Sequence, residues 1–356
     1  MKYPHFISQN KIGLYLTVFA FITAIVMKPA LWLSDPSFPL VPVLESFPIP
    51  SLWVSKFILG FFLLGLLLFT ISQNKIVSFV VLSLVTFLFL TDINRLQPSF
   101  YIMALLLFCY AFQEKTKSSK QLVVLLFAAV YFWSGIHKLN PHFLEVWLNG
   151  LNKRIPFVPY FLRVGFTYAI PFLEAGFGLA LLFKSTRKIG CLLLVLMHLI
   201  ILTAFVLMKT GSNVVPINVL MIGVLLTTIY PEKSTFKAII GFSIQKSFLI
   251  ALIWLLPISN FFGYWDHFVS FSIFSGKPKY AYLVINDAHL EQELPKEIRP
   301  YIMEYNNQKI ISISGLAFDT KAIMIYPETR VYEKIKDYFD SFSSTKDKKA
   351  TTLVEF

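Results

Sequence analysis

Long apolar runs alternate with short polar loops over most of the chain. A helix of about twenty apolar residues rises the roughly 30 Å needed to cross the hydrocarbon layer of a bilayer. The pattern therefore predicts a polytopic, all-α membrane helix bundle of about nine spans. The expected spans are 12–33, 52–72, 76–93, 98–113, 121–138, 161–183, 189–208, 214–230 and 243–262.

The pattern changes after residue 262, where charged residues become more frequent. Alternating stretches at 280–285 and 309–314 predict strands. A helix beginning near Pro327 and Glu328 is predicted by one apolar stripe, formed by Val331, Ile335, Tyr338 and Phe339. We expect a helical domain over 1–262 and a small α+β or β-rich domain outside the membrane over 263–356. Lys346 to Lys349 should belong to a frayed terminus.

Composition supports the membrane class. Of the 356 residues, 56% are hydrophobic and only 15% are charged, against about 25% charged in an ordinary soluble domain. The first apolar run has no small-residue cleavage site and ends at Lys28-Pro29, so we expect a retained span rather than a removed signal peptide.

The net charge is +12, and the distribution of Lys and Arg among the loops predicts the orientation. Basic residues are concentrated in alternate loops, and the positive-inside rule places those loops in the cytoplasm. The rich set is Lys2, Lys11, Lys75, Lys115, Lys117, Lys120, Lys184, Arg187, Lys188, Lys233 and Lys237, and the poor set is Arg95, Lys153, Arg154 and Lys209. We expect a cytoplasmic N-terminus and an outer tail, periplasmic for a bacterial inner-membrane protein, with the proline-rich segment 34–50 as an outer extended cap. No nucleic-acid partner is expected, because no single solvated face gathers the basic residues.

Ionisable residues inside predicted spans indicate a candidate site, because a charge at the bilayer centre is costly. Glu174 and His198 fall near the middle of two consecutive spans. Other polar residues close the outer ends of two earlier spans, namely Asp92, Arg95, His137, Lys138 and Asn140. We expect them to converge on one pocket that opens outward, where a desolvated Lys138 would act as a base with Glu174 and His198 as proton partners.

Each of these residues also has a structural explanation. Lys138 can extend to the headgroup layer, Glu174 can hydrogen-bond a neighbouring hydroxyl, and His198 can be a packing histidine. Asp92 and Arg95 can form a local ion pair at a helix end. His137 points off the face that carries Lys138, since adjacent helical residues diverge.

Other site chemistries find little support in the sequence. No two of the six histidines have metal-ligand spacing on one helix, and no glycine-rich phosphate loop or nucleophile elbow is present. Cys109 and Cys191 lie in apolar runs without a Cys-x-x-Cys motif. We therefore expect no metal site and no dithiol centre.

The segment Val130-Tyr-Phe-Trp-Ser-Gly-Ile-His-Lys-Leu-Asn140 resembles the Tyr-Phe-x-x-Gly-x-x-Lys-Leu-Asn/Asp signature of the vitamin K-dependent gamma-carboxylase and of the bacterial horizontally transferred transmembrane domain (HTTM) proteins. Glu174 and His198 are similar to the pattern that follows in that family. The resemblance extends over 12–262, and Phe268-Val-Ser-Phe-Ser-Ile-Phe-Ser-Gly276 resembles the start of its outer β-rich domain. DoxX-like quinone-associated membrane proteins carry a similar Gly-x-x-Lys-Leu.

The resemblance implies an enzyme in which Lys138 deprotonates a reduced, vitamin K-like quinone. Asp92-Ile-Asn-Arg-Leu-Gln-Pro98 replaces the family's histidine-containing stretch, and the tail is too short for the animal enzyme's propeptide-binding region. Carboxylation of protein glutamates is therefore not expected, whereas a quinol or another lipophilic substrate is. We expect the substrate to contact Asp92, Arg95, Trp133 and Asn140.

Three hypotheses follow for the function. The first is a lysine-base enzyme that acts on a lipophilic small molecule, with a reduced quinone as cofactor. The second is a non-catalytic membrane scaffold or partner subunit of an envelope complex, whose tail binds an envelope protein and whose buried charges fix helix packing. The third is a proton-coupled transporter, which the lack of a visible inverted repeat disfavours.

Overall fold

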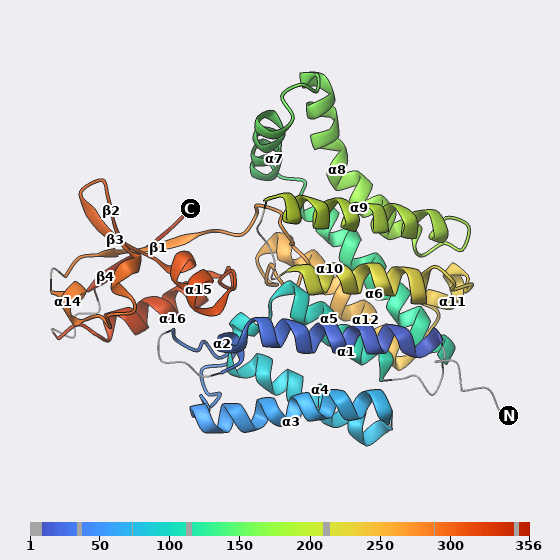
Figure 1. Cartoon of the computed structure of the whole chain (residues 1–356), viewed down its shortest axis with the longest axis horizontal. Coiled ribbons are helices and arrows are strands. Elements are labelled where there is room, and N and C mark those ends of the chain that lie inside the picture. Colours follow the sequence, from blue (N-terminus) through green and yellow to red (C-terminus); the bar gives the residue numbers. More distant parts are fainter. Residues whose placement is uncertain are drawn as a thin grey trace. The chain divides into compact units, whose positions relative to one another are not determined.

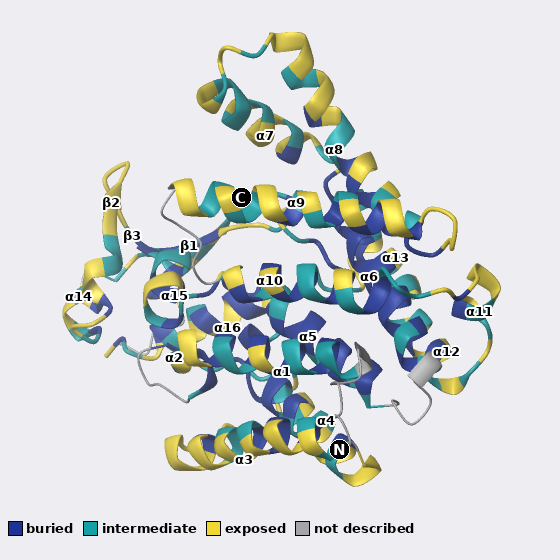
Figure 2. Cartoon of the chain, turned by 45° about the vertical axis from the view of Figure 1, so that its right-hand side comes forward, coloured by how far each residue is buried: buried dark blue, intermediate teal, exposed yellow. Residues whose placement is uncertain are grey.

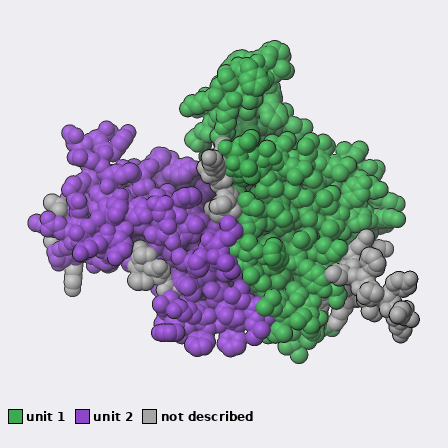
Figure 3. All heavy atoms as spheres, viewed as in Figure 1, with its two compact units in different colours: residues 1–24, 65–82, 98–277 green, residues 25–64, 83–97, 278–356 purple. Residues whose placement is uncertain are grey.

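The structure is a computed structural model of the whole chain, and it describes residues 9–33, 38–72, 74–111, 116–208, 214–287, 289–344 and 349–356. The described residues are mostly helical and contain one four-stranded sheet (Figure 1). They form two compact units, coloured separately in Figure 3. The first unit contains 1–24, 65–82 and 98–277, and the second contains 25–64, 83–97 and 278–356.

The first unit is a helix bundle built around α6 (Thr116–His137), in which every residue from Leu122 to Tyr131 is buried. Several helices of the bundle show mainly intermediate and exposed residues on their outer sides (Figure 2). The other helices are α1 (Gln9–Met27), α5 (Pro98–Tyr110), α7 (Pro141–Arg154), α8 (Tyr160–Ala180), α9 (Arg187–Met208), α10 (Val215–Val224), α11 (Phe236–Ile240), α12 (Ile244–Ile250) and α13 (Leu256–Ser259). Five-residue π-helical segments extend α10 to Ile229 and join α12 to α13.

The chain is an integral membrane protein, but the expected nine crossing helices are not confirmed. Among the described residues, the helices long and apolar enough to cross a membrane are Leu52–Ile71, Ser118–His137, Arg187–Leu207 and Ile244–Phe262. Shorter apolar helices are Lys11–Met27, Lys75–Thr91, Pro98–Tyr110 and Val215–Ile229. The sixth expected span, now α8, is long enough but is not among these four helices, and it carries both Arg163 and Glu174.

Two helix boundaries differ from the sequence prediction. The span expected over 12–33 is divided, because α1 ends at Met27 and Pro29 begins the short helix α2 (Pro29–Trp32). The helix α7 was not predicted. Its start is fixed locally, since the Asn140 side chain accepts a hydrogen bond from Phe143 N at 2.9 Å and Pro141 occupies the first turn.

The second unit contains the sheet, whose strands are β1 (Ala281–Ile285), β2 (Ile302–Tyr305), β3 (Gln308–Ser312) and β4 (Thr351–Glu355). The order is β2-β3-β1-β4 and every pairing is antiparallel. The predicted strands near 280–285 and 309–314 are confirmed as β1 and β3, and the predicted helix is confirmed as α16 (Thr329–Asp340). The remaining helices of the tail are α14 (Leu290–Glu293) and α15 (Ile313–Lys321).

The last residues of the chain form a strand beyond the segment predicted to be frayed, Lys346 to Lys349. Lys346 and its neighbours over 345–348 lie outside the described residues, but the chain beyond Lys349 forms β4 and pairs with β1. The Asp340 carboxylate fixes the start of this strand, accepting hydrogen bonds from Thr351 N at 2.8 Å and Thr351 Oγ1 at 2.6 Å.

The second compact unit is discontinuous in the sequence, and the domain division predicted at 262/263 stays a prediction. Parts of α3 (Leu52–Ile71) and α4 (Lys75–Thr91) group with the sheet, as does the irregular segment after residue 38. Contacts inside the second unit show why, because Gln97 Nε2 donates to Met324 O at 2.8 Å and Tyr326 N donates to Asn94 Oδ1 at 3.1 Å. Residues 34–37 of the expected proline-rich cap lie outside the described residues.

Candidate functional site

Two glycines bring α6 and α8 into close backbone contact. A Cβ atom at Gly135 would lie 2.5 Å from Pro171 O, and one at Gly178 would lie 2.8 Å from Phe132 N. Both distances are too short for a side chain. Gly135 contacts Pro171 in the middle of α8, whereas Gly178, nearer the end of α8, contacts the earlier residue Phe132 of α6. The two helices are therefore antiparallel and pack with almost no side chain between them.

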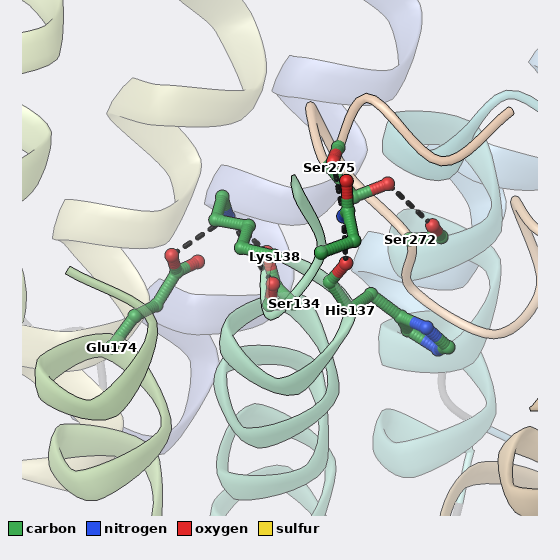
Figure 4. A network of polar contacts seen from close by, with 7 residues as sticks. Ser134, His137, Lys138, Glu174, Ser272 and Ser275 are labelled. Atoms are coloured by element: carbon green, nitrogen blue, oxygen red, sulfur yellow. Dashed lines mark hydrogen bonds and ion pairs between the residues drawn. The ribbon is translucent and has the colours of Figure 1, made fainter. Parts of the chain in front are cut away.

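This close contact positions Lys138 opposite Glu174. Lys138 Nζ lies 2.7 Å from Glu174 Oε2, and it also donates to Ser134 Oγ at 2.8 Å and to Ser134 O at 3.3 Å (Figure 4). Lys138 is 8% exposed and Glu174 is 9% exposed. The expected proximity of these two residues is confirmed. An ammonium has three N–H donors, so all three are used within the protein.

His198 belongs to a second polar group. Its Nε2 lies 2.7 Å from Tyr131 OH, and its Nδ1 lies 2.7 Å from Asn218 Oδ1. Asn218 Nδ2 donates to Val214 O at 2.8 Å, which assigns its Oδ1 as an acceptor. His198 Nδ1 is therefore the donor of the neutral ring, and Nε2 accepts from the Tyr131 hydroxyl.

The two groups share one face of α6, because Tyr131, Ser134 and Lys138 follow one another at i, i+3 and i+7. Within the residues that the structure describes, no hydrogen bond joins the Lys138 group to the His198 group. The predicted role of His198 as a proton partner of Lys138 stays a prediction. Sequence reasoning missed Tyr131, Ser134 and Asn218 as partners, although their polarity within apolar runs was a usable signal.

Trp133 and His137 lie on a different face of α6, at i and i+4. The His137 ring stacks on Phe261 with centroids 4.9 Å apart and planes at 14°, and the Trp133 ring lies 6.0 Å from it. In Figure 4 the His137 ring points away from the Lys138–Glu174 pair. The structure therefore does not bring Trp133 beside Lys138.

Asn140 connects three segments of the first unit. Its Nδ2 donates to His137 O at 2.9 Å and to Ser275 O at 2.8 Å, while its Oδ1 caps α7. These bonds use both amide donors and one acceptor position. The predicted substrate-binding role of Asn140 is untested, and these contacts give the side chain a structural role.

Asp92 and Arg95 belong to the second unit, whereas Lys138, Glu174 and His198 belong to the first. Asp92 Oδ1 accepts from Asn94 N at 3.2 Å and starts the 3-10 turn Ile93–Arg95. The fully buried Arg95 donates instead to oxygen atoms of the same unit, namely Leu31 O, Trp32 O, Leu88 O and Thr91 Oγ1. The convergence expected for all the polar residues is therefore not observed within either unit.

A further buried polar group lies at the other end of α6. Lys246 Nζ donates to Gln121 Oε1 at 2.6 Å, and Gln121 Nε2 donates to Ser234 Oγ at 2.8 Å. Arg187 donates to four carbonyl oxygens, those of Leu181, Leu182, Glu232 and Ser234. Gln121 and His137 are separated by about 24 Å along a helix of this length. Polar groups thus hold both ends of the buried helix.

No group of three or more His, Cys, Asp or Glu side chains suited to a metal ion occurs in the described part of the chain. Cys109 and Cys191 are both buried and unpaired as thiols.

Comparisons with known proteins correct the resemblance drawn from the sequence. The family model that matches is described as methylamine utilisation protein MauE, and it matches residues 116–216. The vitamin K carboxylase and HTTM resemblance is therefore wrong, because the segment that carried it matches a different family. No curated protein and no solved structure matches the chain. From α6 to the start of α10, a range that contains Lys138, Glu174 and His198, the chain is similar to the MauE family.

Proposed function

We propose that this protein is a non-catalytic membrane subunit, whose helix bundle is a rigid anchor and whose tail binds an envelope protein. The observation that carries the proposal is the bonding of Lys138. Its three N–H donors meet Glu174 Oε2, Ser134 Oγ and Ser134 O, so the ammonium has no donor left for a ligand. The Glu174 carboxylate, 2.7 Å from Nζ, and the two Ser134 oxygens hold the side chain inside the contact between α6 and α8.

Two other buried cations, Arg187 and Arg95, also donate their hydrogen bonds to oxygen atoms of the protein. Arg187 binds the carbonyl groups at the end of α8 and in the loop after α10, and Arg95 binds oxygen atoms of its own unit. Each guanidinium satisfies backbone acceptors that lie away from water. This use of charge fixes the packing of helices and loops, which is what the scaffold hypothesis expects.

The sheet of the second unit offers a surface for a partner. One face is buried against the tail helices, with Leu283 and Ile311 fully buried. The other face, here called the open face, carries apolar side chains that remain exposed. They are Tyr280 (44% exposed), Met303 (45%), Tyr305 (66%), Val354 (43%) and Phe356 (62%). Tyr282 and Phe356 stack on this face with centroids 5.2 Å apart. Exposed aromatic clusters are typical of protein-binding surfaces.

The similarity to a methylamine utilisation protein over 116–216 supports an accessory role in an amine-utilising system. The proposal also includes an orientation, with a cytoplasmic N-terminus and the open face outside the membrane, in the periplasm of a Gram-negative source. The uneven distribution of Lys and Arg among the loops supports it. A lipophilic ligand such as a reduced quinone stays a prediction.

Photo-crosslinking in intact cells tests the proposal. A photoreactive residue replaces Tyr305 or Val354 on the open face, with Phe318 of α15 as the control because it is 59% exposed but outside the sheet. We expect one discrete adduct from the open face and none from Phe318. The adduct should persist when Lys138→Met and Glu174→Leu are combined, since the pair then acts only in packing. The absence of an adduct from both open-face positions would contradict the proposal.

A further inference from the structure

The helices α7 and α8 form a hairpin that leaves the body of the first unit sideways. In Figures 1 and 2 the hairpin runs across the common direction of α1, α9 and α10. It contains residues 141–171, up to the proline inside α8. In α7 Phe143 is buried, Leu144, Leu148 and Leu151 are half-buried, and most of the remaining side chains are exposed.

The helix α7 is amphipathic but too short to cross a bilayer. Its 14 residues rise about 21 Å, against the roughly 30 Å of a hydrocarbon layer. One side is apolar, formed by Phe143, Leu144, Trp147, Leu148 and Leu151, and the opposite side is polar, formed by His142, Glu145, Asn149 and Asn152. A short amphipathic helix between two helices of a membrane bundle suits the plane of the membrane surface.

Exposed aromatic side chains gather at the tip of the hairpin. Phe157 is 82% exposed and Phe161 is 71% exposed, and Tyr160 is also exposed, while the exposed Trp147 lies in the middle of α7. Aromatic residues of this kind are enriched where hydrocarbon meets headgroups. Exposed apolar residues of α8 continue from this tip through Leu162 and Phe166, which are both half exposed.

Three basic residues lie close in sequence to the aromatic tip. Lys153 and Arg154 end α7, and Arg163 lies in α8 with its guanidinium 5.8 Å from the Tyr160 ring. The only acidic residue over 141–163 is Glu145. In the described ranges of the chain, none of the three cations forms an ion pair. An uncompensated positive cluster at the membrane surface is complementary to anionic lipid headgroups.

We infer that the α7–α8 hairpin lies in the interfacial layer of the membrane and binds anionic phospholipid headgroups through Lys153, Arg154 and Arg163. The aromatic tip enters the outer part of the hydrocarbon, and the polar side of α7 faces water. This surface lies in the first unit and is independent of the proposed partner-binding role of the sheet.

Spin labelling of the full chain tests the position of the hairpin. Trp147→Cys, Asn149→Cys and Phe157→Cys are labelled in vesicles of phosphatidylcholine and phosphatidylglycerol, and Cys109 and Cys191 are buried and should not react. Labels at 147 and 157 should be accessible to oxygen, and the label at 149 should be accessible to a water-soluble nickel complex. A label at 157 that is as accessible to nickel as the one at 149, or that reports contact with a second copy, would overturn the inference.

Lipid selectivity tests the cations. Native mass spectrometry compares phosphatidylglycerol retained by the intact protein and by a variant with Lys153→Gln, Arg154→Gln and Arg163→Gln. Retention relative to phosphatidylcholine should fall about fivefold for each cation removed at low ionic strength. The control replaces Lys184, Lys188 and Lys233, which lie at the other end of the bundle, with glutamine. Equal retention by the hairpin variant and the intact protein would also overturn the inference, while equal losses in the two variants would show non-specific charge attraction and reject the site.

Discussion

Ion pairs are buried where α6 contacts α8 but have exposed members in the second unit. Between the helices, Lys138 and Glu174 are both buried and bonded only to each other and to Ser134. In the second unit, the ion pairs Lys279–Glu355 and Lys334–Glu45 have exposed members, and an apolar core holds the strands. A buried charge that loses its partner has no water to replace it, whereas an exposed charge does. We therefore expect a Lys–Glu pair to contribute much to the packing between the helices and little in the second unit.

The largest effect should come from breaking the buried pair on one side. Glu174→Ala leaves the Lys138 ammonium unpaired in an apolar bundle, and we expect a loss of roughly 3–5 kcal/mol of stability. Thermal unfolding of the detergent-solubilised protein and its abundance in the membrane measure this loss. The combined Lys138→Met and Glu174→Leu variant is the matched control, because it removes both charges and should recover most of the stability. A single variant as stable as the intact protein would show that water reaches the pair and would remove the contrast with the sheet.

A smaller effect should come from separating the two helices. Gly178→Leu introduces a side chain where even a Cβ would lie 2.8 Å from Phe132 N. Overpacking of this kind costs about 1–3 kcal/mol, and more where backbone must move. Gly176→Ala is the control in the same helix, because nothing lies within 4 Å of its Cβ position. Unfolding temperatures should fall for the first variant and stay level or rise slightly for the second. Equal behaviour of the two would mean that the close contact does not hold the helices together.

The smallest effect should come from the exposed pair Lys334–Glu45, whose atoms lie 2.8 Å apart. The hydrogen bond and charge of Lys334 lower the pKa of Glu45, and the carboxylate in turn raises the pKa of Lys334. The contribution of Glu45 is thus complete above its ordinary pKa and is lost as the pH falls through the lowered value. The contribution of Lys334 is lost only as the pH rises through its raised value. Lys334→Ala should leave the unfolding temperature near neutral pH almost unchanged, and added salt should remove the difference. A large fall in the unfolding temperature would mean that this exposed pair stabilises the fold as strongly as a buried pair, which would contradict the comparison.

The sequence predicted part of the bundle and part of the tail for physical reasons that the structure makes clear. Lys138 and Glu174 were identifiable because charges are rare in apolar runs, and their pairing needed only the antiparallel order of two consecutive spans. The strands β1 and β3 followed from alternation. The polarity of Tyr131 and Asn218 made them candidates, but their pairing with His198 could not be predicted, because adjacent residues on a helix differ by about 100° in direction and the rotation of each helix is set by packing.

Other features needed tertiary information. The grouping of Asp92 and Arg95 with the second unit depends on contacts with residues far away in the sequence, such as Leu31. The resemblance to the carboxylase failed because it rested on a short run of aromatic, small and lysine residues. In this chain the glycine of that run, Gly135, allows the close contact of α6 with α8.

The direction of the hydrogen bonds around His198 has a consequence for the membrane potential. The Tyr131 hydroxyl donates to the ring, the ring donates to Asn218, and Asn218 donates to the carbonyl oxygen of Val214. A peptide carbonyl cannot accept a proton and pass it on, so the series ends there. A histidine and a tyrosine held in the interior of a bundle could otherwise dissipate an ion gradient. With a terminal acceptor at Val214, the hydrogen bonds join α6, α9 and α10, and among the described residues they offer no continuous path for a proton.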